Sequence, residues 1–353
     1  MRRVLLFEYL HVHSQCYAAA SVSMRNEGRA MLLAIAADLA ALDDVAVTVA
    51  VCETARHDLP SLSTVEFICV GDIDGMDEVG AGRIIRSVLS HGPFSDVLPI
   101  APEIDDVLAT LVRDFRAQGQ HVIAACEATI QLGSDKWQLF QFLQQHQIPT
   151  IPTTLVQDHV AADVSTMSVI KPIDGAGGEG VRRMTHVELD TFKTQSPFDR
   201  NVIVQPFITG QSYSVGLLGR GVHQPPLILP VATQHVAWID DRPQYRGGSV
   251  PAELSPDSEF RLRTLLTQLL NLITVDCGYV GIDLLKPAEI RDGDWLIVEL
   301  NPRLCTSYIG YRAATKSKLA PYLLGICGNA LPEWKTVPVV FSCESSTIAS
   351  YNS

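Results

Sequence analysis

The sequence lacks the cysteine patterns that mark a disulfide framework or a zinc site. Its eight cysteines lie far apart, without a CxxC pair and without histidines at a zinc-type spacing. Most of them fall within apolar runs, so we expect buried, reduced thiols of a reducing cytosol and a cytoplasmic protein.

Long apolar runs are also missing. The longest such stretch, residues 30–42, is interrupted by Asp38 and is shorter than the roughly 20 residues that cross a bilayer. The N-terminus begins like a signal peptide, but Glu8 ends its apolar run, which predicts a first β-strand instead. We therefore expect no membrane partner.

Basic residues are in deficit. The 353 residues include 27 lysines and arginines against 39 acidic residues, for a formal net charge of −12. Such a surface repels nucleic acid and anionic lipid, and no basic stripe compensates, so a small-molecule partner is favoured. With 47% hydrophobic residues, the chain is long enough for two or three domains. The oligomeric state stays open, a homo-oligomer included.

Strand-like and helix-like segments alternate over the first 125 residues. Strands are predicted at 4–10, 45–52, 65–70, 96–101 and 121–126, and helices at 26–42, 77–90 and 103–115. The residues on the buried face of the first helix recur at helical spacing: Leu32, Ile35, Leu39 and Leu42. The alternation predicts βαβ units, and hence a doubly wound α/β domain with a parallel sheet.

After residue 134 the pattern changes to short strands, glycine-rich turns and hairpins. A helix at 134–147 precedes strand–turn–strand segments at 168–184, 201–219 and 279–303, with a proline-rich connection near 225–230 and a helix at 256–274. This part is predicted to be α+β.

A glycine-rich segment, 171–181, holds Gly175, Gly177 and Gly180 at GxGxxG spacing. A dinucleotide fingerprint opens a helix, whereas the residues after Gly180 are strand-like, and no GxxxxGK[ST] motif exists. The glycines therefore lie in a hairpin loop, whose amides can approach phosphates with help from Lys171. An ordinary hairpin with a solvated lysine is an equally good interpretation of this loop alone.

The last predicted hairpin carries a group of oxygen-bearing side chains. Glu299 and Asn301 share one face of their strand, and if the chain turns near Arg291, Asp283 lies opposite Glu299. Two carboxylates and an amide form a site suited to Mg²⁺ or Mn²⁺. Arg303 projects to the same side and could hold a phosphate or carboxylate. The alternative is a structural arginine–carboxylate network.

Together these segments resemble the ATP-grasp superfamily of carboxylate–amine ligases. The resemblance covers residues 134–311, most specifically SDK at 134–136, VIKPIDGAGGEGV at 169–181, VQPFITGQSYSV at 204–215 and GIDLL…VELNPR at 281–303. It implies an N-terminal α/β domain over 1–128 and an ATP-grasp domain over 129–345, with two lobes that grip ATP and a mobile lid lobe at about 150–208.

The resemblance also implies roles for individual residues. The residues implied to bind ATP are Lys136, Lys171, Asp174, Gly175, Gly177, Gly178, Gly180, Gln205, Pro206, Phe207 and Ile208. Asp283, Glu299 and Asn301 match metal ligands, and Arg303 and Lys171 match catalytic residues. Within the superfamily, GYVGIDLL at 278–285 and VELNPRLCTSYIGYR at 298–312 are most similar to the tyramine–glutamate ligase type of methanofuran biosynthesis.

Substrate contacts are predicted for Tyr245, Arg246, Glu27 and Ser307. Arg246 with Arg303 could cradle an acidic substrate, such as glutamate. Tyr245 could stack on an aromatic amine or fill a core. Glu27 and Glu8 could meet an ammonium group, although Glu27 equally suits a first-turn helix position. His11 and His13 are predicted to be surface residues, and Cys305 an inert thiol.

The resemblance implies ligase chemistry, in which ATP activates a carboxylate as an acyl phosphate and an amine then forms an amide. An NAD(P)-dependent dehydrogenase is an alternative that the GxGxxG spacing suggests. A non-catalytic ATP-binding sensor is another, and the same chemistry with a different acceptor is a third.

Overall fold

The computed structural model describes residues 1–71, 78–160, 167–195, 201–222, 224–288, 295–327 and 330–342. Its N-terminal sheet contains β1 (Arg2–Glu8), β2 (Val45–Cys52), β3 (Val65–Val70), β4 (Asp96–Ile100) and β5 (His121–Val122). The strands are all parallel, in the order β3-β2-β1-β4-β5. The strand order changes direction at β1, which confirms the predicted doubly wound domain.

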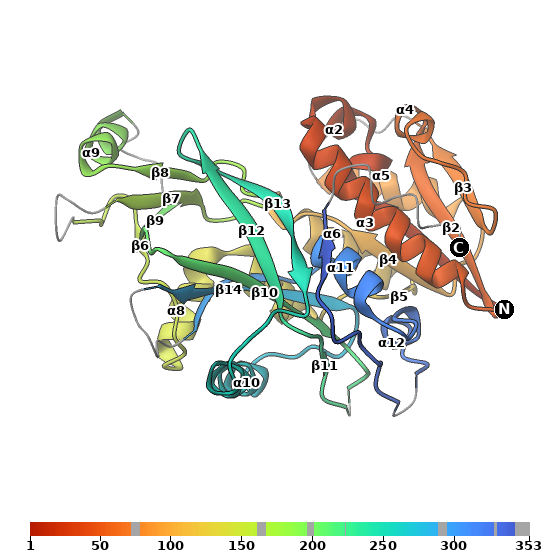
Figure 1. Cartoon of the computed structure of the whole chain (residues 1–353). Coiled ribbons are helices and arrows are strands. Elements are labelled where there is room, and N and C mark those ends of the chain that lie inside the picture. The colour runs from red at the N-terminus through yellow and green to blue at the C-terminus, as the bar shows by residue number, and fades with distance from the viewer. Residues whose placement is uncertain are drawn as a thin grey trace.

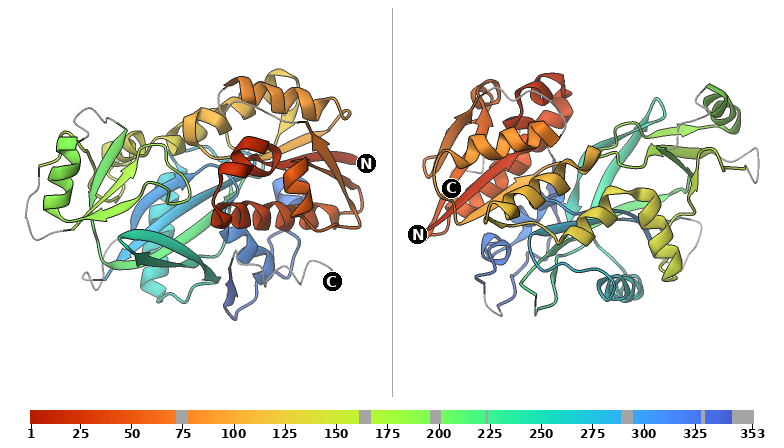
Figure 2. Two further views of the ribbon diagram at one scale, coloured as in Figure 1. Left: turned by 90° about the horizontal axis from the view of Figure 1, so that it is seen from above. Right: turned by 180° about the vertical axis from the view of Figure 1, so that it is seen from behind.

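Helices cover both faces of this parallel sheet (Figures 1 and 2). Successive residues of β1 point to opposite faces, because side chains alternate along a strand. Val4 and Leu6 pack with α3 (Val22–Ala40), whereas Leu5 and Phe7 pack with α5 (Glu78–Leu89) and α6 (Val107–Ala117). The short helices here are α1 (Tyr9–Val12), α2 (Ser14–Ala19), α4 (Glu53–His57) and the 3-10 turn η1 (Ile104–Asp106).

Two predictions are wrong: His11 and His13 are not surface residues, and most of the described cysteines are not fully buried. β1 ends at Glu8, and His11 and His13 then lie in a turn of helix and its cap, both fully buried rather than on the surface. Burial is possible because His11 pairs with the Glu8 carboxylate and the His13 ring accepts from the Cys16 amide. The described cysteines are free thiols, as predicted, but only Cys16 and Cys52 are buried, and Cys69 is exposed on β3. Cys343 lies outside the described residues.

The central sheet is antiparallel, in the order β15-β14-β10-β12-β13-β16, with β11 paired to β10. Its strands are β10 (Gly210–Leu218), β11 (Leu227–Ile228), β12 (Ala232–Ile239), β13 (Arg242–Val250), β14 (Tyr279–Pro287), β15 (Leu296–Asn301) and β16 (Val339–Phe341). The flanking helices are α7 (Glu127–Ser134), α8 (Lys136–Gln145), α10 (Pro256–Leu270), α11 (Ser307–Ala314) and α12 (Ala320–Leu323). The β12–β13 hairpin was not predicted, because few of its side chains are buried and its sequence lacks a clear apolar alternation.

A small lobe projects from this body, at the left of Figure 1. It consists of a third sheet in the order β6-β9-β7-β8, with α9 (His186–Gln195). The strands are β6 (Thr154–Leu155), β7 (Ser168–Pro172), β8 (Arg182–Met184) and β9 (Val202–Pro206). The predicted 201–219 hairpin is therefore divided, since β9 belongs to the lobe and β10 to the central sheet.

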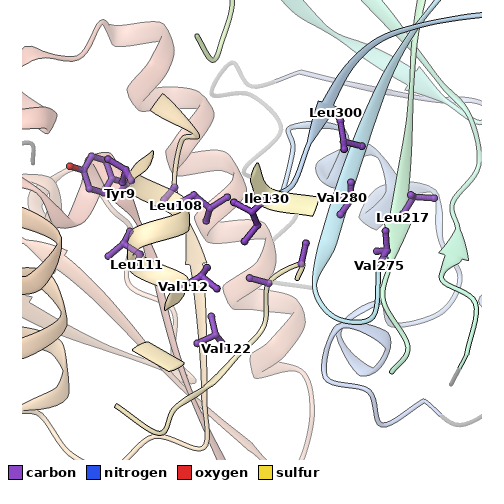
Figure 3. Close-up of a cluster of buried hydrophobic side chains, with 14 of the residues drawn as sticks. Tyr9, Leu108, Leu111, Val112, Val122, Ile130, Leu217, Val275, Val280 and Leu300 are labelled. Carbon is purple, nitrogen blue, oxygen red and sulfur yellow. The ribbon is translucent and has the colours of Figure 1, made fainter. Parts of the chain in front are cut away.

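The two large hydrophobic cores run through both the N-terminal and the central sheet. In one of them, Leu108, Leu111 and Val112 of α6 meet Ile130 of α7 and then Leu217, Val280 and Leu300 of the central sheet (Figure 3). The lobe has a separate core of five buried residues, namely Val156, Ile170, Met184, Leu189 and Val204. Among the described residues, no helix is long and apolar enough to cross a membrane.

Candidate active site

The β14–β15 hairpin places two carboxylates side by side, as predicted. Asp283 pairs with Glu299 and Gly281 pairs with Asn301 in the antiparallel register. The Asn301 side-chain amide donates to Asp283 at 3.0 Å, and Gln234 of β12 donates to the other oxygen at 2.8 Å. The predicted turn at Arg291 lies outside the described residues. The predicted pairing of Asp283 with Glu299 is thus confirmed, and the role of this group as a metal site stays a prediction.

Two lysines reach this hairpin from different parts of the chain. Lys136 lies at the start of α8, which Asp135 caps by accepting from the Gln138 amide. Its Nζ is 2.8 Å from Glu299 Oε1 and also donates to the Gly175 carbonyl. Lys171 comes from β7 of the lobe and is 6% exposed. Burial and the charge of Lys136 lower its pKa to about 8, against the opposing pull of Glu299 and Asp283.

The two carboxylates have opposite pKa shifts. Burial and the charge of Glu299 raise the pKa of Asp283 to about 6. Burial also acts on Glu299, but the charges of Lys136 and Lys171 outweigh it and lower the pKa of that carboxyl. Asp283 is therefore the member of the pair that lacks a cationic side chain in direct contact, and a cation beside it would relieve both its burial and the repulsion.

The donor set fits a hard divalent cation. Asp283, Glu299 and Asn301 offer carboxylate and amide oxygens, which are the ligands that Mg²⁺ and Mn²⁺ take. Within the described ranges, no group of three histidine, cysteine or acidic side chains forms a metal cluster, so the amide of Asn301 is needed to complete the set.

Arg303 extends the site toward the N-terminal domain. It follows β15, is half-buried, and its Nε donates to Glu103 Oε2 at 3.0 Å. Loss of solvent lowers the pKa of its guanidinium, but Glu103 and the neighbouring Cys305 and Glu299 outweigh this effect and raise the pKa above its usual value. Glu103 follows β4 at the carboxyl edge of the parallel sheet, where the strand order reverses and where ligands bind in open α/β sheets.

The glycine loop joins β7 to β8, two antiparallel strands. This is the hairpin that we predicted, and it differs from the strand-to-helix turn of a dinucleotide fingerprint. Gly177, Gly178 and Gly180 have φ values between 64° and 75°, which side chains disfavour. A Cβ at Gly180 would also lie 2.7 Å from Pro172. Asp174 is at hydrogen-bonding distance, 3.5 Å, from the Asp105 amide of the N-terminal domain.

The predicted hinge, 205–208, connects the lobe to the central sheet. Gln205 is buried and donates to Thr153 at 2.8 Å, while the Phe207 amide donates to the Met167 carbonyl. Pro206 is exposed, and Phe207 and Ile208 are half-buried. The Phe207 ring contacts Trp238 edge-on, with centroids 5.5 Å apart. The segment thus passes between lobe and body, where the resemblance places adenine.

The predicted substrate residues are dispersed. Glu27 is half-buried on α3; burial raises its pKa, and the charge of Arg303 opposes this. Ser307 is buried and bonds to the Tyr279 hydroxyl at 3.0 Å. Tyr245 packs beside the core, and Arg246 is exposed, with no contact to Arg303 among the described residues. Cys305 lies beneath the hairpin, and burial raises the pKa of its thiol, in line with an inert role.

Three contacts were missed in the sequence. Glu103 had a signal, because it follows a strand at the switch point of the sheet, whereas Gln234 had none, since it lies on an unpredicted strand. Thr153 likewise had none, because only the fold brings it to Gln205.

The site and the fold define the class of protein. Residues 133–307 match the model of the ATP-grasp domain, so this segment of the chain forms an ATP-grasp domain. Its fold is similar to that of an Archaeoglobus fulgidus protein described as an ATP-grasp superfamily member, with a TM-score of 0.67 at 21% identity over 92% of this chain and 88% of that one. An L-amino acid ligase from Bacillus licheniformis gives a TM-score of 0.67 at 15% identity, over 94% and 75%.

Relatives found by sequence carry a more specific name. Tyramine–L-glutamate ligase of Methanocaldococcus fervens is 25% identical over 246 residues, which cover 69% of this chain and 70% of the relative. The predicted resemblance to the tyramine–glutamate ligase type and the predicted fold class are confirmed.

Proposed function

We propose that this protein is an ATP-dependent ligase that joins a small carboxylic acid to an amine. One observation carries the proposal: the partly buried side chains of Asp283, Glu299 and Asn301 lie together with the buried Lys136 and Lys171 and with Arg303, which come from separate segments of the chain. This arrangement suits the approach of an anionic acid to a polyanionic nucleotide, because such an approach requires neutralisation on all sides.

The reaction has two steps that balance without a further reactant. A carboxylate oxygen attacks the γ-phosphorus of ATP, the bond to the β-phosphate oxygen breaks, and ADP leaves. The amine nitrogen then attacks the acyl carbon, phosphate leaves, and the nitrogen loses a proton to give an amide. A non-catalytic ATP-binding sensor would not need the complete set of charged side chains that this patch retains.

Each part of the site has a task in this scheme. Lys136 and Lys171 bind phosphate oxygens, and Arg303 holds charge that develops on the transferred group. Asp283, Glu299 and Asn301 would hold Mg²⁺ or Mn²⁺, which supplies charge neutralisation at the phosphates when bound. The glycine loop covers the phosphates and keeps water from the acyl phosphate, as a mobile lid lobe over about 150–208 would require.

The two substrates are a small acid and an amine. The relative's name supports glutamate as the acid and an aromatic amine as its partner. Glu27, whose pKa is affected by the charge of Arg303, is our candidate for meeting an ammonium group, whereas the exposed Arg246 has no such support.

The test is an assay of phosphate release and amide formation with ATP, glutamate and a panel of aromatic and aliphatic amines, read by mass spectrometry. We expect Glu299→Ala to lower the rate at least about a hundredfold, the scale of losing one charge-stabilising group. Glu259→Ala is the matched control, because Glu259 is exposed on α10 and pairs only within that helix. Full activity of Glu299→Ala would refute the metal assignment, and NADH binding by fluorescence would favour a dehydrogenase.

A further inference from the structure

Glu103 is a buried carboxylate that links the N-terminal domain to the phosphate-handling side of the site. It is 5% exposed and lies three residues after β4 ends at Ile100. Its Oε2 accepts from Arg303 Nε at 3.0 Å, across 200 positions of sequence. Its Oε1 has no hydrogen-bond partner among the described residues. This residue is absent from every motif that identified the site.

Arg303 has several acidic neighbours that compete for it. Its charge acts on Glu299 and Asp283 of the hairpin, and on Glu27 of α3. A guanidinium is always charged and prefers two-pronged contact with carboxylates. Without Glu103, Arg303 would be free to pair with the hairpin carboxylates, and pairing with them would occupy the oxygens that a metal needs.

The geometry shows which acid Arg303 selects. Its Nε is fixed by Glu103, and Nη1 makes a 3.4 Å contact with the Leu304 carbonyl, whereas Glu299 is paired with Lys136 at 2.8 Å. Glu103 of the N-terminal domain therefore fixes the Nε atom of the guanidinium. In this arrangement Arg303 does not occupy the carboxylates of the hairpin.

We propose that Glu103 is a positioning residue, which holds the Arg303 guanidinium toward the N-terminal domain and so keeps Asp283 and Glu299 available to a divalent cation. The inference rests on the proposed ligase function. It makes the N-terminal domain a contributor to phosphoryl transfer, through a residue that touches neither nucleotide nor metal.

The first experiment measures ligase rates for Glu103→Ala, Glu103→Gln, Arg303→Ala and the double variant Glu103→Ala/Arg303→Ala. We expect Glu103→Ala to lower kcat about 10- to 100-fold, as loss of an orienting partner does. Glu103→Gln is expected to lose less, because its amide oxygen still accepts from Nε. In the Arg303→Ala background the Glu103 change should add nothing. An equal further loss there would overturn the proposal.

The matched control is Asp38→Ala, which removes a comparable, partly buried link between α3 and Arg312 of α11 without touching Arg303. It is expected to lower stability and leave kcat within about twofold. If Asp38→Ala reduced kcat as much as Glu103→Ala does, Glu103 would be a structural residue and the proposal would fail.

A second experiment titrates Mn²⁺ alone and follows its free concentration by electron paramagnetic resonance. Glu103→Ala should weaken binding about tenfold, and the double variant should regain the wild-type affinity, because no guanidinium then competes for the hairpin acids. A double variant as weak as Glu103→Ala would contradict the proposal. If wild-type protein forms no amide, the ligase function fails, yet this titration still decides the role of Glu103.

Discussion

The body and the lobe of this protein are stabilised in different ways. In the body, two cores continue from the N-terminal sheet into the central sheet, and partly buried ion pairs such as Asp38 with Arg312 add to them. The lobe has only its own five-residue core. The difference indicates that the body unfolds and moves as one unit, whereas the lobe can change position without disturbing it.

The charged groups of the site are divided between these two regions. The hairpin acids, Lys136 and Arg303 belong to the body, while Lys171 and the glycine loop belong to the lobe. Few polar contacts join the two halves, among them Lys136 to the Gly175 carbonyl. The site is therefore complete only where residues of both regions meet.

The tip of the β12–β13 hairpin provides another tie to the lobe. The Arg183 amide of β8 donates to the Asp241 carbonyl at 2.8 Å, and its guanidinium is 3.0 Å from the Asp241 carboxylate. The same guanidinium lies over the rings of Phe207 and Trp238, at 5.0 and 5.2 Å from their centroids. We name this group, Arg183, Asp241, Phe207 and Trp238, the lobe latch.

We expect the largest difference between the two regions when a cavity of similar size is made in the core of each. Ile35 in the body and Leu189 in the lobe are both fully buried. Ile35→Ala should destabilise the whole chain by about 2–5 kcal/mol, seen as a shift of the main calorimetric transition. Leu189→Ala should leave that transition nearly unchanged and increase proteolysis of the lobe. A shared shift would show that lobe and body unfold together.

The partly buried carboxylate of Asp38 tests the link between the N-terminal sheet and α11. It accepts from the Tyr308 hydroxyl at 2.8 Å and pairs with Arg312, although burial raises its own pKa against the pull of that arginine. Asp38→Ala leaves both donors without this acceptor and should cost about 1–3 kcal/mol, measured by urea unfolding. The exposed Asp257, paired with Arg261 within α10, is the control, and Asp257→Ala should cost below about 0.5 kcal/mol.

The lobe latch predicts a functional effect without a stability effect. Arg183→Ala removes an ion pair and two cation–π contacts, together about 1 kcal/mol of closure. The KM for ATP should rise about fivefold while the unfolding midpoint of the body stays the same. The neighbouring Arg182, exposed on the same strand, is the matched control as Arg182→Ala. An unchanged KM for Arg183→Ala would show that the lobe latch does not contribute to ATP binding.

The smallest effect concerns acid stability of the body. Burial opposes ionisation of Asp96, but hydrogen bonds from Arg2 and His121 outweigh it and hold its pKa below the usual value. Because the folded pKa lies below the unfolded value of about 3.9, the carboxylate stabilises the protein above that pH, and the contribution is lost as pH falls through the folded pKa.

The lowered pKa of Asp96 can be tested by measuring stability against pH. Asp96→Asn should lower stability at pH 7 by about 1 kcal/mol, and the difference from wild type should shrink below pH 4, as urea unfolding at several pH values would show. Asp114, whose side chain is 37% exposed, is the control. A difference that stays constant with pH would mean that the ionised form of Asp96 is not what stabilises the fold.

Much of this arrangement could be predicted from local pattern. The parallel domain followed from alternating apolar segments, and the Asp283–Glu299 pair followed from counting along a hairpin. The β12–β13 hairpin could not be predicted, because its half-exposed strands lack an apolar face. The partner of Arg303 was also out of reach, because Glu103 meets it only after two domains have packed together.

The β12–β13 hairpin contacts the lobe at its tip and, through Gln234, the Asp283 carboxylate nearer its base. One hairpin thus connects the lobe with a carboxylate of the site. A molecule or a substitution that bends this hairpin would therefore change the position of the lobe and the surroundings of the Asp283 carboxylate together.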